Sequence, residues 1–449
     1  MNPLLTKYYL NPQSTARASI PAEPAFNNVD YLTLRPVAGA NLGPSTQIKF
    51  FLPTRNLSMV LGEAMLCIEG SVKLSTLPYT RRKPDNTTET ITPADVVHLR
   101  SNFTAHLFSQ ITLKLADQVV EIEREPGLSS TVKLQVRSSD SERPHLELAG
   151  ISLGSPLAPP TIQQLNTEKT AISFSVIYPL RYLLDSLQDM VQVIKGCNLE
   201  LICQRSELSS RCLKITDSFQ PELNVLTLGK CELVIPYVQL TDQGVLKQLE
   251  FFQSGANQDI SYRQHRIFIN DDLPKGSTKL FWDLGPRSST ETPTHAILAF
   301  FPNLKSYTLD QFFPINPRIQ RVTAHVNGQR THLSSLDTDQ DSSTSNHLMF
   351  YVNFLQFRLE WFGLTNLFED TVGLYSKEQF KKSPYFCFSL HTDQNATFNS
   401  LDELAFEVSF LENVPDDTIA VCILIHQQLL SFNPKSQLVQ TDRPIAGGA

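Results

Sequence analysis

The sequence predicts an all-β protein of two consecutive β-sandwiches with short helical insertions, and three observations lead to this prediction. Short segments with alternating apolar residues run along the whole chain of 449 residues, which is typical of strands that bury one face. The length exceeds that of one sandwich and suits two domains of about 200 residues. One plan also occurs twice, because the hairpin at Ile111 recurs at Val322, 211 positions later. Many short strands with long loops and one helix in each half favour jelly rolls over immunoglobulin-like domains.

The strongest helix signal lies between Pro179 and Gly196. Proline suits a first helical position, and glycine can take the left-handed conformation that ends a helix. The apolar residues between them follow one helical stripe: Leu180, Leu183, Leu184, Leu187, Met190, Val191 and Ile194. Residues 199–204 then alternate as in a strand. We therefore expect one helix that leads directly into a strand, as an insertion across the first sandwich.

The other regular elements of the first half are expected to be mostly strands. They are Ile48–Phe51, Leu61–Leu74, Ile111–Leu115, Val119–Ile122, Leu223–Leu228 and Cys231–Val238. Residues 116–118 form the turn of the hairpin, residues 94–108 are expected to carry a short helix, and residues 79–93 read as a solvated loop.

The second half repeats this pattern. Strands are expected at residues 258–270, 278–284, 295–303, 319–330, 404–410 and 419–425. The Asn327-Gly328 step is a strong hairpin signal, because both residues tolerate positive φ. Residues 364–382 carry signals of a helical segment between the apolar segments 350–361 and 385–393.

Polar segments predict the domain organisation. It comprises an N-terminal arm at 1–28, a first jelly roll at 29–240, a second at 241–432 and a C-terminal tail at 433–449. Both ends are low in apolar residues and cannot offset their own ordering entropy. The Pro- and Ser-rich segment 126–170 and the polar segment 331–347 are expected to project outward, because such compositions do not fill a core.

Composition excludes several classes of function. The net charge of −7 gives no electrostatic reason to bind nucleic acid or an anionic membrane. Seven cysteines at irregular spacing indicate reduced thiols in a reducing compartment. The first ten residues lack the regions of a secretory signal, and no window is apolar enough to span a membrane. With hydrophobic residues at 41%, the chain can fill sizeable cores.

Two short motifs imitate functional sites but lack essential parts. Residues 150–154 match G-x-S-x-G, yet prolines follow where a nucleophile elbow needs a helix, so a plain loop is favoured over a hydrolase. Asp337, Asp339 and Asp341 imitate the start of a calcium loop, but Leu348 stands where the closing glutamate belongs. A solvated acidic loop is therefore favoured, with weak cation binding as the alternative.

Two further features are candidate sites. Cys197, Cys203 and Cys212 lack the paired spacing of a zinc site. His265 lies between Arg263 and Arg266 and could mark an anion contact, although an exposed strand edge or a subunit contact is favoured. No catalytic, cofactor-binding or metal-binding residue is therefore assigned.

Three segments, taken in order, resemble the double jelly-roll major capsid proteins, in particular the hexon-like proteins of Polinton/Maverick elements and adintoviruses. AHLFSQITLKLADQVV (105–120) resembles the family's short helix, alternating strand and tight turn. Residues 174–206 resemble its Leu-rich run that leads into a strand ending near an Arg-Ser. Residues 295–330 resemble the strand, linker and hairpin of the second jelly roll. The first turn departs from the family, which often has Asn-Gly, and Arg287–Pro293 interrupts a strand pair.

This resemblance implies a structural, non-enzymatic capsid protein without a cofactor. It implies a homotrimer that forms pseudo-hexagonal capsomers in an icosahedral shell around double-stranded DNA, with neighbouring capsomers, a single jelly-roll penton protein and minor capsid proteins as partners. Neither sequence-specific nucleic acid binding nor a membrane span is implied. The protein would be made in the host cytoplasm and reside in the virion.

The alternative is a β-sandwich that binds or processes carbohydrate. Such proteins usually present exposed Trp or Tyr platforms, and glycan-processing ones also need paired carboxylates. Trp282 and Trp361 lie in apolar strand-like segments, so we expect both in the core.

Overall fold

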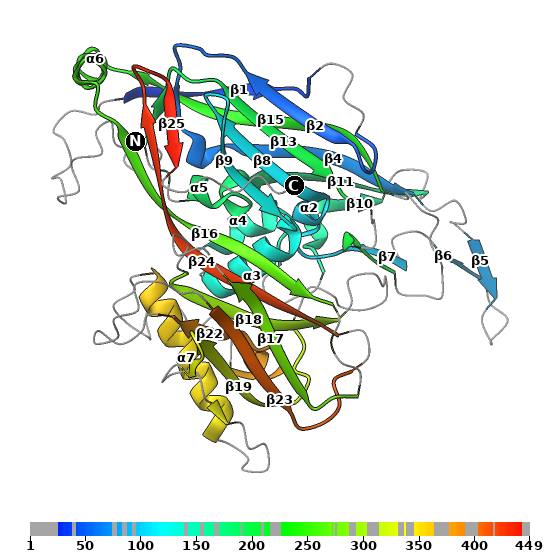
Figure 1. Cartoon of the computed structure of the whole chain (residues 1–449). Helices are drawn as coiled ribbons and strands as arrows, with labels where there is room; N and C mark the ends of the chain where they lie inside the picture. Colours follow the sequence, from blue (N-terminus) through cyan, green and yellow to red (C-terminus); the bar gives the residue numbers. More distant parts are fainter. Residues whose placement is uncertain are drawn as a thin grey trace.

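The computed structural model of the chain confirms an all-β architecture (Figure 1). It describes residues 26–37, 42–73, 79–82, 88–91, 96–138, 142–152, 157–165, 170–188, 190, 192–207, 211–215, 226–271, 273, 276–286, 293–302, 314–330, 336–337, 345–362, 377–390, 403–415 and 418–441. Strands of these residues pair antiparallel throughout and form two sandwiches, one above the other in Figure 1. Short helices lie between the sandwiches.

The first sandwich packs a seven-stranded sheet against a four-stranded one. The larger sheet has the order β10 (Gln163–Leu165), β11 (Ala171–Pro179), β4 (Met65–Lys73), β15 (Leu226–Leu240), β3 (Ser58–Met59) and β12 (Ile194–Lys195), with β1 (Phe26–Leu34) also paired to β15. The smaller has the order β2 (Gln47–Leu52), β13 (Leu199–Arg205), β8 (Phe108–Leu115) and β9 (Gln118–Arg124). Alternation explains the burial: Ile48, Phe50 and Leu52 of β2 are buried while their neighbours are exposed.

The second sandwich repeats the design with two five-stranded sheets. One has the order β16 (Gln258–Asn270), β24 (Thr418–Asn433), β18 (His295–Pro302) and β22 (Phe386–Ser389), with β25 (Leu438–Thr441) paired to β24. The other has the order β17 (Lys279–Pro286), β23 (Glu403–Phe410), β19 (Ile319–Val326) and β20 (Gln329–Arg330), with β21 (Leu336–Asp337) on β19. Helix α7 (Ser345–Phe362) covers this half with Phe350, Phe354 and Phe357, and α8 (Lys377–Lys382) follows it. The apolar segment 350–361 is therefore helical.

The remaining elements are short. They are the 3₁₀ turns η2 (Leu61–Glu63), η4 (Pro160–Ile162) and η5 (Leu180–Tyr182), the helices α2 (Phe103–His106) and α4 (Arg143–Leu148), the β5–β6 hairpin (Tyr79–Arg82, Thr88–Ile91) and the β7–β14 pair (Val97–Leu99, Leu213–Ile215). The short helix expected within 94–108 is confirmed as α2. Part of the segment read as a solvated loop, 79–93, instead forms the β5–β6 hairpin.

The strands β16 and β24 belong to both halves. They pair continuously from Gln258↔Phe432 to Asn270↔Ala420. Ile260 of β16 packs in the first core, whereas Ile267 packs against the second. The two sandwiches are thus joined by a strand pair that runs through both cores.

The two predicted hairpin turns are confirmed. Ala116 and Asp117 have φ of 47° and 63° between β8 and β9, and Asn327 and Gly328 have φ of 50° and 72° between β19 and β20. Positive φ at both central positions matches the right-handed twist of the flanking strands. An alanine and an aspartate therefore adopt the conformation usually given to Asn-Gly.

The prediction of one helix from Pro179 to Gly196 is wrong. The segment instead forms the end of β11, η5, the one-turn helix α5 (Asp185–Gln188) and β12. Its described apolar residues are buried, but they face different neighbours, and β12 pairs with Met59 and Ser58. Gly62 packs so closely that an added Cβ would lie 2.4 Å from the Met190 carbonyl oxygen. Close packing against several elements therefore overrides helix propensity.

The prediction that residues 126–170 project outward is wrong for the first part of this segment, residues 126–138. Helix α3 (Pro126–Arg137) lies between the sandwiches, and α4 follows it (Figure 1). Leu128, Val132 and Val136, spaced four residues apart, pack in the second core. Several polar residues of α3 are buried together with hydrogen-bond partners. Asn102 Nδ2 donates to Ser130 Oγ and Thr131 Oγ1, at 2.8 Å each.

The predicted terminal arms lie partly among the described residues. Strand β1 begins at Phe26, inside the expected N-terminal arm, and β25 lies inside the expected C-terminal tail, where Val439 packs in the first core. Residues 1–25 and 442–449 lie outside the described part. Of the segment 331–347, the structure describes β21 and the start of α7, so its outward projection stays a prediction.

Gly127 provides a test of the packing of α3. An added Cβ would lie 2.1 Å from Nδ1 of the buried His106. We expect Gly127→Ala to lower the free energy of unfolding by about 1–3 kcal/mol, as overpacking does. Urea denaturation measures this, with Gly229→Ala as the matched control because the nearest atom to its added Cβ is 3.9 Å away. Equal losses in the two variants would contradict the close packing.

Candidate functional site: a buried charge cluster between the sandwiches

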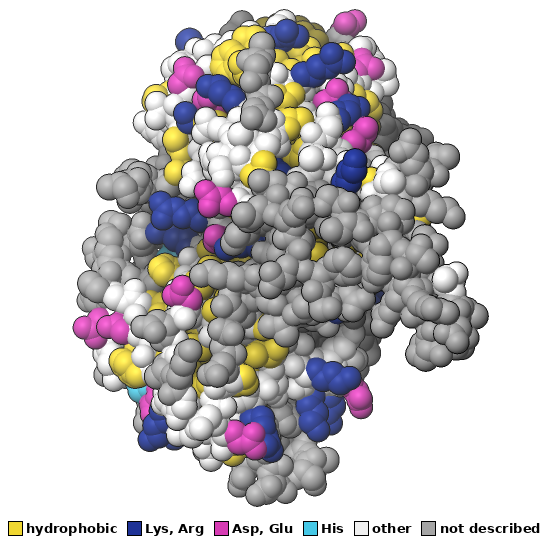
Figure 2. Space-filling view, turned by 90° about the vertical axis from the view of Figure 1, so that its right-hand side faces the viewer, with side chains coloured by type: hydrophobic (Ala, Val, Ile, Leu, Met, Phe, Trp, Pro, Cys, Tyr) yellow, Lys and Arg dark blue, Asp and Glu magenta, His cyan; other side chains and the backbone are white. Residues whose placement is uncertain are grey.

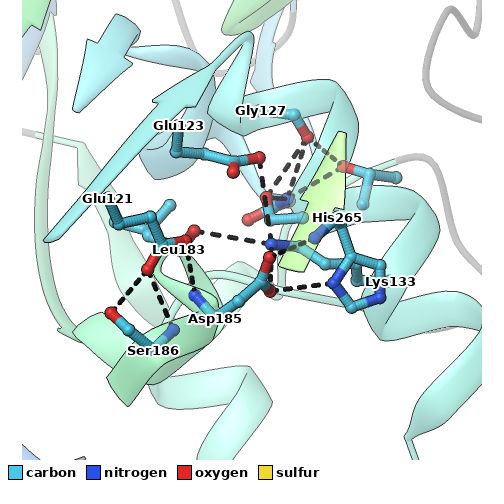
Figure 3. A network of polar contacts seen from close by, with 11 residues as sticks. Glu121, Glu123, Gly127, Lys133, Leu183, Asp185, Ser186 and His265 are labelled. Carbon is cyan, nitrogen blue, oxygen red and sulfur yellow. Dashed lines mark hydrogen bonds and ion pairs between the residues drawn. The ribbon is translucent and has the colours of Figure 1, made fainter. Parts of the chain in front are cut away.

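Five ionisable side chains meet where the two sandwiches join (Figure 3). Glu121 and Glu123 come from β9, Lys133 from α3, Asp185 from α5 and His265 from β16. All are buried, with exposed fractions of 7% or less. The two glutamates are two residues apart on one strand and so share a face. The cluster therefore ties the neighbouring elements β9 and α3 to α5 and β16, which are distant from them in the sequence.

Asp185 is the centre of the cluster. Its Oδ1 accepts a hydrogen bond from Lys133 Nζ at 2.9 Å and lies 3.0 Å from His265 Nδ1. Its Oδ2 accepts from the His265 backbone N–H at 2.7 Å. Lys133 Nζ also donates to the Leu183 carbonyl at 3.4 Å and lies 3.9 Å from Glu123 Oε1. One carboxylate thus fixes both a helix side chain and a strand backbone.

Glu121 holds the start of α5. Its Oε1 accepts from the Asp185 N–H at 2.8 Å, and its Oε2 accepts from the Ser186 N–H at 2.9 Å. The first amides of a helix have no partner within the helix, so a carboxylate satisfies them. Glu121 therefore positions Asp185 for its contacts with Lys133 and His265.

Burial and charge set the protonation states of the cluster. Burial, together with repulsion from Asp185, raises the pKa of Glu121 to about 7. Burial raises the pKa of Glu123 to about 8, although Lys133 opposes the shift. Burial alone would lower the pKa of Lys133, but attraction to Asp185 and the glutamates outweighs it and raises the pKa to about 12. At neutral pH the charged core of the cluster is therefore the Lys133–Asp185 pair, with a proton held on Glu123.

Two further pKa values point to the same charged pair. Burial disfavours the charge on Asp185, but His265 and Lys133 outweigh it and lower the pKa of Asp185. Burial lowers the pKa of His265 despite the nearby carboxylate. His265 is thus neutral at neutral pH, and Nδ1 is the nitrogen that best carries its proton, because that atom faces the Asp185 carboxylate.

The donor set resembles a cation site. Oxygen atoms of Glu121, Glu123 and Asp185 lie within 4.8 Å of one another. The ammonium of Lys133 already supplies a positive charge there, 2.9 Å from Asp185. The adjoining cavity, lined by Lys133 and His265, measures about 10 Å³, roughly one water molecule. This arrangement suits a structural joint and leaves no room for a substrate.

The structure places the sequence candidates elsewhere or gives them other roles. His265, expected at an exposed strand edge or subunit contact, is instead buried against Asp185. In the G-x-S-x-G motif, helix α4 precedes Gly150, whereas an elbow needs a strand there, and Ser152 N–H donates to Ser101 Oγ at 2.9 Å. The described part thus fits the loop interpretation, and Gly154 lies outside it.

The remaining candidates do not gather into a site among the described residues. Cys197, Cys203 and Cys212 are buried thiols whose pKa values are raised by burial, which disfavours the thiolate that zinc requires. Asp337 lies in β21, while Asp339 and Asp341 lie outside the described part. Trp282 is buried as expected, and the side chain of Trp361 is not described.

An open groove of about 500 Å³ lies on the outer face of the first sandwich. Hydroxyl-bearing residues of three strands line it, including Ser71, Ser173 and Thr227. The aromatic ring in its lining is that of Phe174, which is buried. The groove therefore lacks, among the described residues, the exposed aromatic platform that carbohydrate binding usually needs.

The raised pKa of Glu123 predicts a pH dependence. Between its ordinary value of 4.5 and about 8, the folded chain binds a proton that the unfolded chain has lost. Stability therefore falls as the pH rises through this window, by up to about 1.4 kcal/mol per pH unit. We expect Glu123→Gln to remove the contribution of Glu123 to the decline between about pH 6.5 and 8, while Glu121, whose pKa is about 7, still contributes. Urea denaturation at each pH measures it. Glu69→Gln, on an exposed side chain, is the control, and equal slopes in all three proteins would contradict the prediction.

The Lys133–Asp185 pair predicts a second result. Lys133→Met leaves a buried carboxylate without its cation and should lower the free energy of unfolding by about 3–5 kcal/mol. Adding Asp185→Asn should recover part of this loss, which a double-mutant cycle detects. The exposed Lys230→Met should cost less than about 0.5 kcal/mol. Strictly additive losses for the pair would show that the two charges do not stabilise each other.

The chain shares its fold with viral capsid structures. A chain of the cryo-EM structure of the Sputnik virophage superimposes with a TM-score of 0.61, at 8% identity, over 98% of this chain and 93% of that one. The mavirus major capsid protein gives 0.53 at 11% identity, over 97% and 93%. The Faustovirus major capsid protein gives 0.52 at 8% identity, over 91% of both chains. The chain matches no curated protein at a significant level.

The sequence itself agrees with this likeness. Residues 97–430 match the family described as the double jelly roll-like domain. The match begins in β7 and ends within β24, so it takes in strands of both sandwiches and the buried charge cluster between them. Because this match covers well over half of its length, the chain belongs to the double jelly roll-like domain family.

Proposed function

We propose that the chain is a structural major capsid protein of a virion, without enzymatic activity. The observation that carries the proposal is the extent of the likeness, because the mavirus and Faustovirus major capsid proteins are matched over more than nine tenths of their own chains. The buried charge cluster is closed to substrates and acts as a joint, which suits a structural role.

The proposed unit is a homotrimer. Three chains with two similar lobes each give a nearly hexagonal outline that tiles a flat lattice although the symmetry is threefold. Exposed apolar side chains on strands of both sandwiches, among them Tyr31, Ile177 and Phe281, support association between copies. In the capsomer the strands would stand roughly normal to the shell surface.

The proposed partners and type follow from the resemblance. They are neighbouring capsomers, a single jelly-roll penton protein and minor capsid proteins, in a shell around double-stranded DNA of the Polinton/Maverick or adintovirus type. On the face shown in Figure 2, basic and acidic side chains are interspersed, which suits a subunit without sequence-specific nucleic acid binding. None of the described helices is long and apolar enough to cross a membrane.

The proposed division of the chain keeps the first jelly roll at 29–240 and the second at 241–432. β15 ends at Leu240, and the next strand, β16, joins a different sheet, which supports this boundary. Residues 1–28 and 433–449 are proposed as terminal segments that contact neighbouring capsomers, the inner face of the shell or a minor capsid protein. β1 and β25 show that parts of both also pair within the chain.

Native mass spectrometry tests the trimer. We expect a species of three times 50.5 kDa at micromolar concentrations, and hexagonal outlines in negative-stain images. An obligate interface of this kind buries more than about 2,000 Å² and leaves the monomer poorly stable. A stable monomer or dimer under all assembly conditions would remove the capsomer proposal and favour the carbohydrate-binding alternative.

A further inference from the structure

Helix α6 (Asp242–Ser254), which connects the two halves, leaves part of its apolar surface exposed. The residues that it buries are Gly244 and Gln248, and the side chain of Gln248 accepts a hydrogen bond from Lys195 Nζ at 2.8 Å. Phe251 and Phe252, near its end, are half-buried, whereas Val245, Leu246 and Leu249 are 38%, 60% and 46% exposed. Positions i, i+1 and i+4 lie on one face of a helix. An apolar helix face therefore points away from the protein, at one end of the first sandwich (Figure 1).

The helix does not depend on that face for its formation. Thr241 caps its first turn, with Oγ1 accepting from the Gly244 N–H at 3.1 Å, and Asp242 places a negative charge there. Gly255 ends it in the left-handed conformation, with φ of 67°. Signals at both ends thus define α6. Helix formation therefore does not explain the exposed apolar face of α6. Binding of another segment to that face would explain it.

The register of β1 shows which segment is nearest. β1 pairs antiparallel to β15, with Phe26 opposite Leu240. The chain before Phe26 therefore leaves the sheet at the same end at which β15 passes into α6. Sixteen to twenty-two extended residues span up to about 50–75 Å, so residues 4–10 can reach α6 of their own chain.

The sequence of that segment complements the helix. Leu4, Leu5 and Tyr8 repeat the spacing of Val245, Leu246 and Leu249. Lys7 is the only Lys, Arg, Asp or Glu among the first sixteen residues, whereas α6 carries Asp242 and Glu250 against Lys247. A short tether also gives the segment a high effective concentration at its own helix. We propose that Leu4, Leu5 and Tyr8 bind the exposed apolar face of α6 in the same chain.

Hydrogen–deuterium exchange of the full chain tests this contact. A covered helix opens less often than one with an exposed apolar face, so its amides exchange more slowly. We expect Leu5→Ser combined with Tyr8→Ser to speed exchange of residues 246–254 about tenfold, with no change in β8 or β19. Ile20→Ser, an apolar residue before Phe26 but outside residues 4–10, is the matched control and should change nothing.

A second variant approaches the contact from the other side. Leu246→Ser should speed the exchange of residues 4–10, and adding it to the first variant should bring no further change in α6. Unchanged exchange in the Leu5→Ser, Tyr8→Ser chain would overturn the proposal. Protection of α6 that grows with protein concentration would also overturn it, because a second copy would then cover the helix.

Discussion

The buried pair of Lys133 and Asp185 is the interaction on which the junction of the two sandwiches depends. Lys133 belongs to α3, and Asp185 belongs to α5, which Glu121 of β9 holds at its first amides. The Asp185 carboxylate also accepts a hydrogen bond from the backbone N–H of His265 and so fixes β16. Removing a charge from water costs free energy that its partner must return, so the pair adds little net stability but permits few alternative arrangements. The cluster therefore fixes the arrangement of β9, α3, α5 and β16 more than it adds to the free energy of unfolding.

The junction shows why polar composition is a poor guide to exposure. The residues of α3 include serines, a threonine, a lysine and a glutamine, yet almost all of them are buried. Tyr178 O–H donates to Asn102 Oδ1 at 2.7 Å, and Asn102 in turn donates to the hydroxyl groups of α3. A buried hydroxyl with a partner costs little, whereas one without a partner costs much. The apolar spacing of Leu128, Val132 and Val136 is the sequence signal for this helix. The prediction of an outward projection followed the polar composition of the segment instead of this spacing.

Strands and turns could be predicted from the sequence because their signals are local. Alternation in β2, β8 and β13 follows from one face meeting a core, and the Asn327-Gly328 turn follows from backbone preference alone. The apolar stripe from Leu180 to Ile194 led to the wrong prediction of one helix. These residues are buried against several different neighbours, so their helical spacing does not reflect one helix face packed on one core. The charge cluster could not be found in this way. Glu121 and Glu123 read as the polar face of an edge strand, and their partners lie up to 144 positions away.

The strand pair that passes through both cores has a mechanical consequence. A strand is nearly fully extended, at about 3.3 Å per residue, so it has no slack to release. β16 and β24 therefore connect the sandwiches as two extended strands, and pulling the halves apart has to break the hydrogen bonds and packing of this pair. Bending and twisting of the ribbon remain the soft motions. A particle built from such subunits would transmit tension through the chain itself and accommodate curvature by small changes of angle.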